Sequence, residues 1–523
     1  MSAIHQVLLA GGGATYQIAN SLRFRAANSA YLSRTFGSPT SSTVWTFSAW
    51  CKRGTLGSTS YLLGASTTTN FGFNSSNQLV LTLNGTTACT STAVFRDPSA
   101  WMHIVYQQNG SAQTIYVNNA SVATGTTAAA IFNTAIAHQV GAANTTNFFD
   151  GHLANVYWID GQALTPSSFG QTDATTGVWV PKAYSGTYGT NGFFLQFKDA
   201  TSTTTIGYDT SGNSNNFTTS GISVTSGTTF DQMTDTPTNN YCVLSQINKS
   251  TAGGTVKNAG LTWNSGGGGA TFYLVQSTFV LSGKCYWEFV VPASITFPRP
   301  GIMRADQSPP SSGASYWPGG GSGPANSVGY VCNDGDIYVG GVAVVTGATP
   351  SAGDIIMFAF DAATGELWVG RNGTWLNSGD PAAGTGEVTT VSLSYSWVAT
   401  VCDASTQDAD INFGQRVFSY TPPSGFTALS TANIASTAVT TSGSFTGNAA
   451  ADGPFVWTNG NPATLVINGN AVTFGTHADK TAGGFKLRTS SASYNASGSN
   501  SWTATAGKRF VQVKKPNNAQ VNP

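Results

Sequence analysis

Short segments in which apolar and polar residues alternate recur about every ten residues along most of this chain, a spacing typical of β-sandwiches. Residues 46–50, 79–83, 103–106 and 114–117 are examples, each flanked by turn-forming residues. A two-residue period places successive side chains on opposite faces of a strand. Helical periodicity is nearly absent; the best short helix is residues 164–169, with Pro166 at its first position. The pattern predicts an all-β fold of consecutive antiparallel β-sandwiches.

The length of 523 residues is too great for one compact core. Residues 231–240 carry turn formers and no alternation, and after about residue 435 the composition becomes poorer still in charge. Residues 465–474 are predicted to form a hairpin on an Asn-Gly turn. The predicted organisation is an N-terminal arm (1–20), a first sandwich (21–228), a linker that packs on its neighbours (229–258), a second sandwich (259–434), a small β-rich domain (435–510) and a tail (511–523).

Charged residues make up only 8% of the chain, where about 25% is usual for soluble domains. Ser, Thr, Asn and Gly replace them, and such a surface offers little charge repulsion between copies, which favours an assembly. The 22 basic and 22 acidic residues cancel, so nucleic acid and anionic membranes are not expected partners. No apolar run approaches the roughly 20 residues that cross a bilayer, so membrane insertion is not expected. No Lys or Arg precedes Val7, which indicates synthesis and assembly in a cytoplasm rather than secretion.

The residues that carry enzyme or metal chemistry are sparse. The six cysteines are expected to be buried free thiols rather than disulfide partners or metal ligands: Cys51, Cys89, Cys242, Cys285, Cys332 and Cys402. In the Asn- and Gly-rich stretch after Asp209, one carboxylate plus amides would make a poor calcium site, so the stretch is expected to be a turn. No Glu precedes Glu288, so the first sandwich lacks the paired carboxylates of a glycosidase, and His103 and His152 lie in strand patterns that favour structural roles. We therefore predict no catalytic residue, metal site or cofactor.

Residues 21–225 resemble the laminin-G-like branch of the concanavalin A-like sandwiches. The resemblance rests on an ordered series of segments: 21–24, 45–50, 101–106, 115–119 and 149–156. Residues 116–119, Tyr-Val-Asn-Asn, resemble the family's Tyr-Val-Asn-Gly hairpin, with Asn119 in place of glycine. The resemblance implies a two-sheet lectin-type fold for the first domain.

Residues 260–432 resemble a SPRY domain, a two-sheet sandwich that in its family recognises proteins or ligands without catalysis. The matching pieces are Gly-Lys-Cys-Tyr-Trp-Glu-Phe at 283–289, the Asp-led strand at 353–361, Gly-Glu-Leu-Trp-Val-Gly-Arg-Asn-Gly-Thr-Trp at 365–375, and the closing strand at 411–416. From the residues themselves, Asn372 and Gly373 are expected to turn a hairpin and Trp368 to fill the core.

Binding in the SPRY family uses loops at one end of the sandwich, which here would include residues 312–324 and 372–376. The first lies in a long Pro/Gly/Ser loop, a type of segment that often has a binding role. Tyr316, Trp317 and Trp375 are therefore the predicted ligand contacts. The alternative is that these rings fold back on the core or on a neighbouring subunit, because interfaces and sugar sites favour the same side chains.

The order of the two modules resembles large bacteriophage tail and fibre-associated proteins. The linker Asp-x-Met-x-Asp-x-Pro-Thr-Asn-Asn-Tyr at 231–241 and the segment 418–426 contribute to this resemblance. It implies a non-enzymatic structural virion protein of a tail fibre, tail tip or capsid fibre, assembled in the host bacterial cytoplasm, with host-receptor or glycan binding. Expected partners are other virion proteins, further copies of the chain, and a host surface glycan or protein receptor. Residues 1–20, with glycines 11–13 as a hinge, are the expected virion anchor.

Two other functions remain open at this point. One is a purely structural connector or decoration protein that touches no host molecule. The other is a polysaccharide depolymerase, which would need paired carboxylates in a groove.

Overall fold

The computed structural model describes residues 16–128, 131–174, 176–267, 269, 271–310 and 316–433, together with short strands between residues 443 and 521. The chain divides into two compact units, of which one contains residues 14–171 and 179–434 and the other contains residues 435–523. The all-β prediction is confirmed. Within the described part the helices are short 3-10 turns: η1 (Ala26–Asn28), η2 (Pro166–Ser168), η3 (Thr205–Gly207), η4 (Asn258–Gly260) and η5 (Leu376–Ser378). The predicted helix near Pro166 is η2, and none of these helices could span a membrane.

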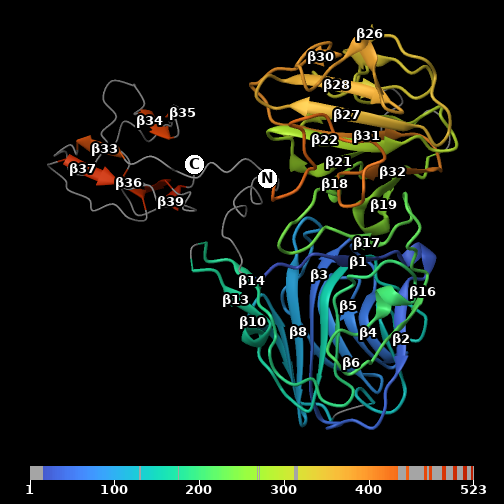
Figure 1. Cartoon of the computed structure of the whole chain (residues 1–523), viewed down its shortest axis with the longest axis vertical. Coiled ribbons are helices and arrows are strands. Elements are labelled where there is room, and N and C mark those ends of the chain that lie inside the picture. The colour runs from blue at the N-terminus through green and yellow to red at the C-terminus, as the bar shows by residue number, and fades with distance from the viewer. Residues whose placement is uncertain are drawn as a thin grey trace. The chain divides into compact units, whose positions relative to one another are not determined.

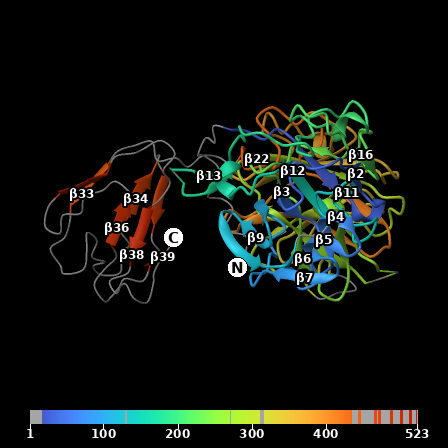
Figure 2. The same ribbon diagram turned by 90° about the horizontal axis from the view of Figure 1, so that it is seen from below.

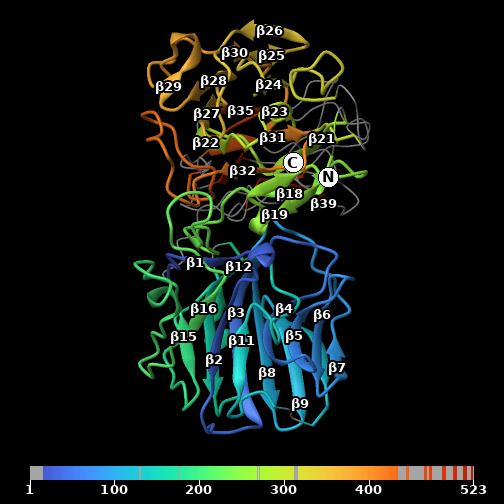
Figure 3. The same ribbon diagram turned by 90° about the vertical axis from the view of Figure 1, so that its right-hand side faces the viewer.

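The first sandwich consists of two antiparallel sheets, coloured blue to green in Figure 1 and seen from two further directions in Figures 2 and 3. One sheet has the order β10 (Ala120–Gly125), β9 (Ala112–Val117), β8 (Met102–Asn109), β3 (Val44–Arg53), β12 (Gly151–Asp160), β1 (Ser21–Phe24) and β17 (Gln232–Met233), with β15 (Phe193–Leu195) also paired to β12. The other has the order β16 (Thr218–Ser220), β2 (Tyr31–Thr35), β11 (Ala137–Val140), β4 (Ser60–Ser66), β5 (Thr69–Phe73), β6 (Leu79–Leu83) and β7 (Thr86–Thr90). Figure 3 shows β2, β11, β4, β5 and β6 side by side. Two short strands, β13 (Gly170–Thr172) and β14 (Trp179–Pro181), lie in the connection between β12 and β15.

Aromatic rings fill the space between these two sheets. Trp45 and Trp158 stack with their centroids 4.3 Å apart, and Tyr106 meets Trp45 edge-on at 4.6 Å. Both tryptophans are fully buried, and they come from the neighbouring strands β3 and β12. Large rings bury much apolar area per residue, so they supply the core volume that a chain so rich in Ser, Thr and Gly otherwise lacks.

The second sandwich also has two antiparallel sheets, coloured green to orange in Figure 1. One has the order β18 (Leu244–Lys249), β21 (Tyr273–Val280), β31 (Trp397–Asp403), β23 (Arg299–Arg304), β24 (Val328–Tyr330), β25 (Ile337–Val339) and β26 (Val342–Val345). The other has the order β19 (Thr255–Lys257), β20 (Thr262–Asn264), β32 (Asp408–Asn412), β22 (Lys284–Val290), β27 (Ile355–Asp361), β28 (Glu366–Arg371) and β29 (Thr374–Trp375), with β30 (Thr389–Thr390) paired to β28. Alternate residues of the central strands, such as Trp287, Phe289, Ile356 and Phe358, form the core between the sheets.

Residues 229–258, which we call the junction segment, supply strands to both sandwiches. β17 extends the first sandwich beside β1, whereas β18 and β19 extend the two sheets of the second. The segment also carries two buried carboxylates. Asp231 pairs with Arg23 at 2.9 Å and with Arg25 at 2.8 Å, and Asp235 pairs with Lys52 at 2.7 Å. Because each buried charge has an opposite charge in contact, the segment is fixed on the first sandwich by directional bonds.

A further contact joins the first sandwich directly to η4. The carboxylate Oδ1 of Asp150 accepts the backbone N–H of Ala259 at 2.5 Å. Gly54 lies against the same pair, and a Cβ atom there would approach Asp150 Oδ1 to 2.4 Å and the Ala259 Cα to 2.5 Å. Only glycine therefore allows this close approach. Burial raises the pKa of Asp150 to about 6.

The second unit is described by its strand pairs alone. β34 (Thr464–Ile467) pairs with β35 (Asn470–Thr473), with Ile467 opposite Asn470, which confirms the predicted hairpin; its turn residues lie outside the described ones. β33 (Gly443–Thr446) pairs with β37 (Ser499–Trp502), and β38 (Val511–Lys514) lies between β36 (Lys486–Thr489) and β39 (Gln520–Val521). Residues 1–15 of the expected N-terminal anchor at 1–20 lie outside the described residues.

Replacement of Asp235 by Ala is expected to lower the free energy of unfolding by about 3–5 kcal/mol, because it leaves the Lys52 ammonium buried without its counter-charge. The Asp235 carboxylate also accepts the Trp101 indole N–H at 2.8 Å, which adds to the loss. Chemical denaturation followed by tryptophan fluorescence measures the effect. Lys257→Ala is the matched control, since its pair with Asp408 is exposed and should contribute less than about 1 kcal/mol. Equal losses in the two variants would contradict the structural role of the junction segment.

Candidate functional site

The two tryptophans predicted as ligand contacts lie on different sheets of the second sandwich. Trp317 packs on Met303, Val398 and Cys402, which alternate along β23 and β31 with core residues and so define the outer face of that sheet. Trp375 packs with Tyr286, Met357 and Trp368 on the outer face of the opposite sheet. The structure therefore does not join Trp317 and Trp375 into one site.

The surroundings of Trp317 are extensive. The Arg299 guanidinium lies 4.8 Å from the Trp317 ring centroid and 4.5 Å from that of Phe272, and Tyr338 meets Trp317 edge-on at 5.5 Å. The neighbouring Tyr316 is half-buried, and its backbone oxygen accepts the Cys402 thiol at 3.6 Å. Tyr316 and Trp317 therefore lie at the same place in the fold, and the Trp317 ring packs on the outer face of the sheet that contains β23 and β31.

Trp375 has comparable packing. Its ring meets Tyr286 edge-on at 6.4 Å, and Phe418 and Tyr420 belong to the same cluster. The Glu288 carboxylate holds this cover in place, because it accepts the backbone N–H groups of Ser419 and Tyr420, each at 2.8 Å. Trp375 is half-buried as a result.

A depression of about 340 Å³ opens at one end of the second sandwich, where the two sheets meet. Tyr330 comes from the end of β24 in one sheet, and Arg371 and Thr374 come from β28 and β29 in the other. We call it the end depression and define it by its lining residues, which are Tyr330, Ala348, Arg371, Asn372, Thr374 and Leu376.

The Asn372-Gly373 turn positions this site. Both residues have positive φ, 48° and 84°, as a two-residue hairpin requires, and the predicted hairpin between β28 and β29 is confirmed. Because side chains alternate along a strand, Thr374 and Leu376 line the depression whereas Trp375 between them packs on the outer face. The predicted site residue is therefore one position away from the residues that line the depression.

Arg371 is held in a fixed orientation in the wall of the end depression. Its Nη1 donates to the backbone oxygens of Ala348 at 2.6 Å and Thr349 at 2.9 Å, and its Nε lies 3.8 Å from Asp354 Oδ2. Asn372 completes the arrangement by donating to Asp354 Oδ1 at 2.7 Å. Nη2 of Arg371 has no hydrogen-bond partner within the described residues, so a ligand oxygen can accept from it.

Tyr330 forms the floor and is 1% exposed. Burial raises the pKa of its hydroxyl, the negative charges of Asp354 and Asp334 act in the same direction, and Arg371 opposes them. The phenol is therefore neutral and able both to donate and to accept. The accessible apolar part of the lining comes from Ala348 and Leu376, so the depression combines a few fixed polar groups with a small apolar surface.

The lining contains no carboxylate, imidazole or thiol. Glycoside hydrolysis needs two carboxyl groups that face each other across the sugar, and the end depression offers none. Its arrangement suits binding of a small polar ligand.

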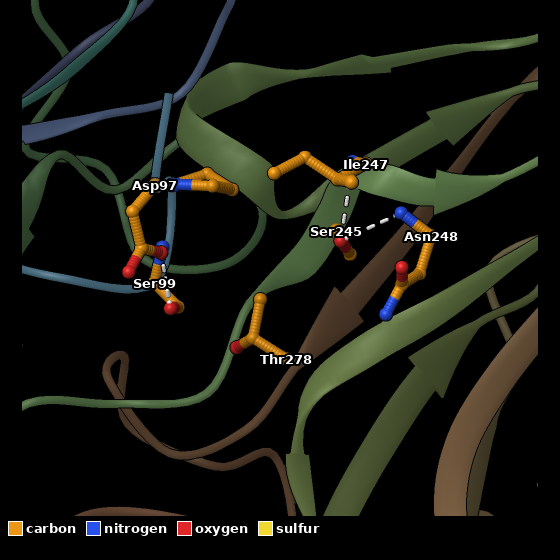
Figure 4. A pocket seen from close by; sticks show the side chains of 7 residues that line it. Asp97, Ser99, Ser245, Ile247, Asn248 and Thr278 are labelled. Atoms are coloured by element: carbon orange, nitrogen blue, oxygen red, sulfur yellow. Dashed lines mark hydrogen bonds between the residues drawn. The ribbon is translucent and has the colours of Figure 1, made fainter. Parts of the chain in front are cut away.

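A second hollow is lined by residues of both sandwiches, as Figure 4 shows: Asp97, Pro98, Ser99, Ser245, Ile247, Asn248 and Thr278. Its free volume of about 20 Å³ is sufficient for a water molecule. Ser245 Oγ accepts the backbone N–H groups of Ile247 at 3.2 Å and Asn248 at 2.9 Å, and Asp97 accepts that of Ser99 at 2.8 Å. This hollow is too small for a sugar.

His103 has the structural role that its strand position predicted. Its Nδ1 accepts the Trp179 indole N–H at 3.0 Å, so the proton resides on Nε2, which donates to Ser48 Oγ at 2.8 Å. The imidazole is also stacked on Trp50, with centroids 5.0 Å apart, and burial lowers its pKa to about 3. The buried His152 lies between Lys52 and Arg23 in register, and its pKa is lowered by burial and by these two cations. The expectation of a satisfied structural histidine is wrong here, because neither ring nitrogen has a hydrogen-bond partner within the described residues.

The Asp209 stretch is a turn. The carboxylate accepts the backbone N–H groups of Phe194, Ser211 and Asn215, each at 2.8 Å. In the described part of the chain, no group of three or more His, Cys, Asp or Glu residues is arranged to hold a metal ion. The six cysteines are buried and free, as expected, and burial raises the pKa of Cys51 to about 12.

Comparison with known proteins gives a family match for the first sandwich. Residues 26–170 match the family described as the concanavalin A-like lectin/glucanases superfamily. The solved structures similar to this chain include the SPRY domain of human HERC1 (16% identity, TM-score 0.25, 32% of this chain and 96% of that one). They also include a protein of Bacteroides ovatus described as carbohydrate-binding (14% identity, TM-score 0.29, 39% of this chain and 58% of that one). No curated protein matches the chain. The first sandwich is therefore similar to lectin-type domains that include both binding proteins and glucanases.

His103→Phe is expected to make the free energy of unfolding depend less steeply on pH in the acid range. The unfolded chain takes up a proton near pH 6.5 and the folded chain only near pH 3, so His103 costs about 1.4 kcal/mol of stability per pH unit as the pH falls between these values. The variant should be less stable at pH 7, because it loses two hydrogen bonds, but its slope between pH 6 and 4 should be shallower by that amount. Urea denaturation across this range measures it, with the exposed Tyr208→Phe as control. An unchanged slope would show that His103 is already charged when folded.

Proposed function

We propose that the protein is a non-catalytic, carbohydrate-binding structural component of a bacteriophage particle, from a tail fibre, tail tip or capsid fibre, that contacts glycans on the host surface. The end depression is the observation that carries this proposal. It combines the Arg371 guanidinium, the Thr374 hydroxyl and the Asn372 amide with the apolar side chains of Ala348 and Leu376. Sugars present hydroxyl edges and apolar ring faces, and a site that joins polar and apolar side chains can contact both.

The size and rigidity of the end depression support this function. Its volume of about 340 Å³ lies within the usual range of small-ligand sites. The hydrogen bonds of Arg371 and Asn372 hold the polar groups in place before a ligand arrives. Little conformational entropy is then lost on binding, which favours recognition of one sugar unit by a small site.

Three carboxylates of the first sandwich that are engaged by protein donors support a binding function over a glucanase function. Asp160 accepts the backbone N–H groups of Thr40 at 2.7 Å and Asn191 at 3.0 Å, and the side-chain amide of Asn133 at 2.6 Å. Asp150 and Asp209 accept backbone N–H groups in the same way. Carboxylates engaged with fixed donors stabilise loops and are poorly placed to attack a glycosidic bond.

The virion location and the partners are proposed from composition and module order. The surface carries few charges, which removes a common barrier to repeated contacts between copies, and symmetric homo-oligomers are the usual outcome. Two joined sandwiches preceding a further β-rich region resemble the arrangement of phage tail and fibre-associated proteins. We infer that the chain associates with other virion proteins and with copies of itself.

Thr374→Trp should abolish or strongly weaken glycan binding, because the indole would fill the end depression. We expect at least about a tenfold loss of apparent affinity, which is typical when a central contact is blocked. A glycan array probed with the full-length protein, followed by titration of the best ligand, measures it. Thr364→Trp is the control: it is an exposed threonine at the other end of β28.

Absence of binding by the unaltered protein to any glycan or host-cell preparation would contradict the proposed function and favour a purely structural connector. Shortening of host polysaccharide on incubation with the protein would favour a depolymerase.

The oligomeric state is a separate prediction. Sedimentation velocity should show a homo-oligomer whose proportion rises with concentration, because the surface offers little charge repulsion between copies. Raising the salt concentration should have little effect, since few ion pairs would be available to screen. A stable monomer at high concentration would contradict this prediction.

A further inference from the structure

A lysine, an aspartate and an asparagine meet where the junction segment lies on the first sandwich. Lys52 comes from β3, and Asp235 and Asn240 come from the junction segment. The Lys52 Nζ lies 2.7 Å from Asp235 Oδ2 and 2.7 Å from Asn240 Oδ1. In the order named, the three residues are 1%, 0% and 9% exposed. A primary amine is thus in contact with a carboxylate and with an amide carbonyl, away from bulk water.

Both groups that contact the amine are held by further hydrogen bonds. Asp235 Oδ1 accepts the Trp101 indole N–H at 2.8 Å. Asn240 Nδ2 donates to the Ser99 backbone oxygen at 2.7 Å, which keeps the carbonyl side of the amide facing Lys52. Groups that the fold fixes at contact distance need little further loss of freedom to react, and this can lower a reaction barrier greatly.

We propose that Lys52 and Asn240 join in an isopeptide bond, formed by the protein itself once it has folded, with Asp235 as the proton carrier. The inference goes beyond the proposed function and does not depend on it. A lysine amine becomes a nucleophile when it is desolvated and has lost its proton to a neighbouring base. The buried contact with Asp235 supplies both conditions.

The reaction balances without any added reagent. Lys52 passes one proton to Asp235, and the lone pair of Nζ attacks Cγ of Asn240, so that the Nζ–Cγ bond forms. Asp235 then moves a second proton from Nζ to Nδ2, the Cγ–Nδ2 bond breaks, and ammonia leaves. The products are a secondary amide and ammonia, which takes the remaining proton from Asp235 as ammonium. The Tyr241 backbone oxygen, now 2.7 Å from Nζ, can accept the one N–H of the new amide.

The bond would brace the connection between the two sandwiches. It closes a loop between residues that are 188 positions apart, and a cross-link stabilises the folded state by restricting the unfolded chain. It also ties β3, which lies between β8 and β12, to the segment that supplies β18 and β19 to the second sandwich. Tension along the chain would then pass into a central strand rather than separate β17 from β1.

An exposed group of the same three residue types provides the contrast. The Lys257 Nζ lies 2.8 Å from Asp408 Oδ1, and the same oxygen accepts Asn264 Nδ2 at 2.6 Å. Here the asparagine presents its NH2 group to the carboxylate, and the Lys257 and Asp408 side chains are 33% and 46% exposed. The ammonium is therefore hydrated and charged, and we expect no bond at this group.

Mass spectrometry of the full-length protein tests the proposal. The intact mass should be lower than that of the sequence by one ammonia molecule. After proteolysis, the peptides that contain Lys52 and Asn240 should appear as one branched species. The peptides of Lys257 and Asn264 should remain separate and provide the internal control.

Two variants assign the roles. Lys52→Arg keeps a positive charge but removes the nucleophile, so it should restore the full mass. Asp235→Asn keeps both reacting groups and removes the proton carrier, so it should also leave the mass unreduced. Lys257→Arg is the matched control and should retain the deficit of one ammonia. The unaltered protein decides the question by itself if a variant fails to fold.

An unaltered protein of full mass, with separate Lys52 and Asn240 peptides, would overturn the inference. A mass deficit that persists in Lys52→Arg would also overturn it, because the ammonia would then be lost elsewhere. A cross-link that still forms in Asp235→Asn would overturn the role given to Asp235. None of these outcomes affects glycan binding, which is measured separately.

Discussion

Buried ion pairs fix the junction segment on the first sandwich, and the position of the strands that this segment gives to both sandwiches depends on them. Arg23, Arg25 and Lys52 are almost fully buried in a chain that has few charges, and each contacts Asp231 or Asp235. An isolated buried cation costs several kcal/mol, so these side chains can be buried only where the carboxylates meet them. The same residues, 229–258, also contribute β17 to one sandwich and β18 and β19 to the other. The two sandwiches therefore form one compact unit rather than two domains on a free tether.

The end depression depends on a different constraint, the meeting of two sheets at a sandwich end. A central strand buries its alternate residues in the core, but at the strand ends the sheets leave space between them. Tyr330 closes that space from one sheet, and the Asn372-Gly373 turn brings Arg371 and Thr374 to it from the other. Backbone carbonyls and Asp354 then orient the guanidinium. The polar groups of the end depression are thus held in place by the fold itself, which is the arrangement that the proposed recognition uses.

Much of the fold could be predicted from sequence, whereas the candidate site could be predicted only in outline. The strands around Trp45, Trp287 and Trp368 have a two-residue period that is visible in the sequence. The hairpin at Asn372-Gly373 is likewise visible in the sequence, from its turn residues. From the sequence, the loop at 372–376 was a predicted binding loop, and its aromatic residue Trp375 was the predicted ligand contact. That ring packs instead on the outer face beside Tyr286, because alternation turns it away from the depression that Thr374 and Leu376 line. Alternation is readable from the sequence, and it places Thr374 and Leu376 on the face opposite to Trp375. It therefore indicated Arg371, Thr374 and Leu376 as alternative candidates for the lining.

Sequence alone determined the class of structure, since period-two patterns, tryptophan-rich strands and frequent turn residues are local properties that strongly favour antiparallel sheets. Tertiary structure alone decided which side chains meet. Trp317 and Trp375 lie on different sheets, Lys52 finds its counter-charge 183 positions away at Asp235, and Tyr330 shares a site with Arg371. The physical reason is that periodicity specifies which face of a strand a residue occupies, whereas the pairing and stacking of distant strands specify which other faces it meets.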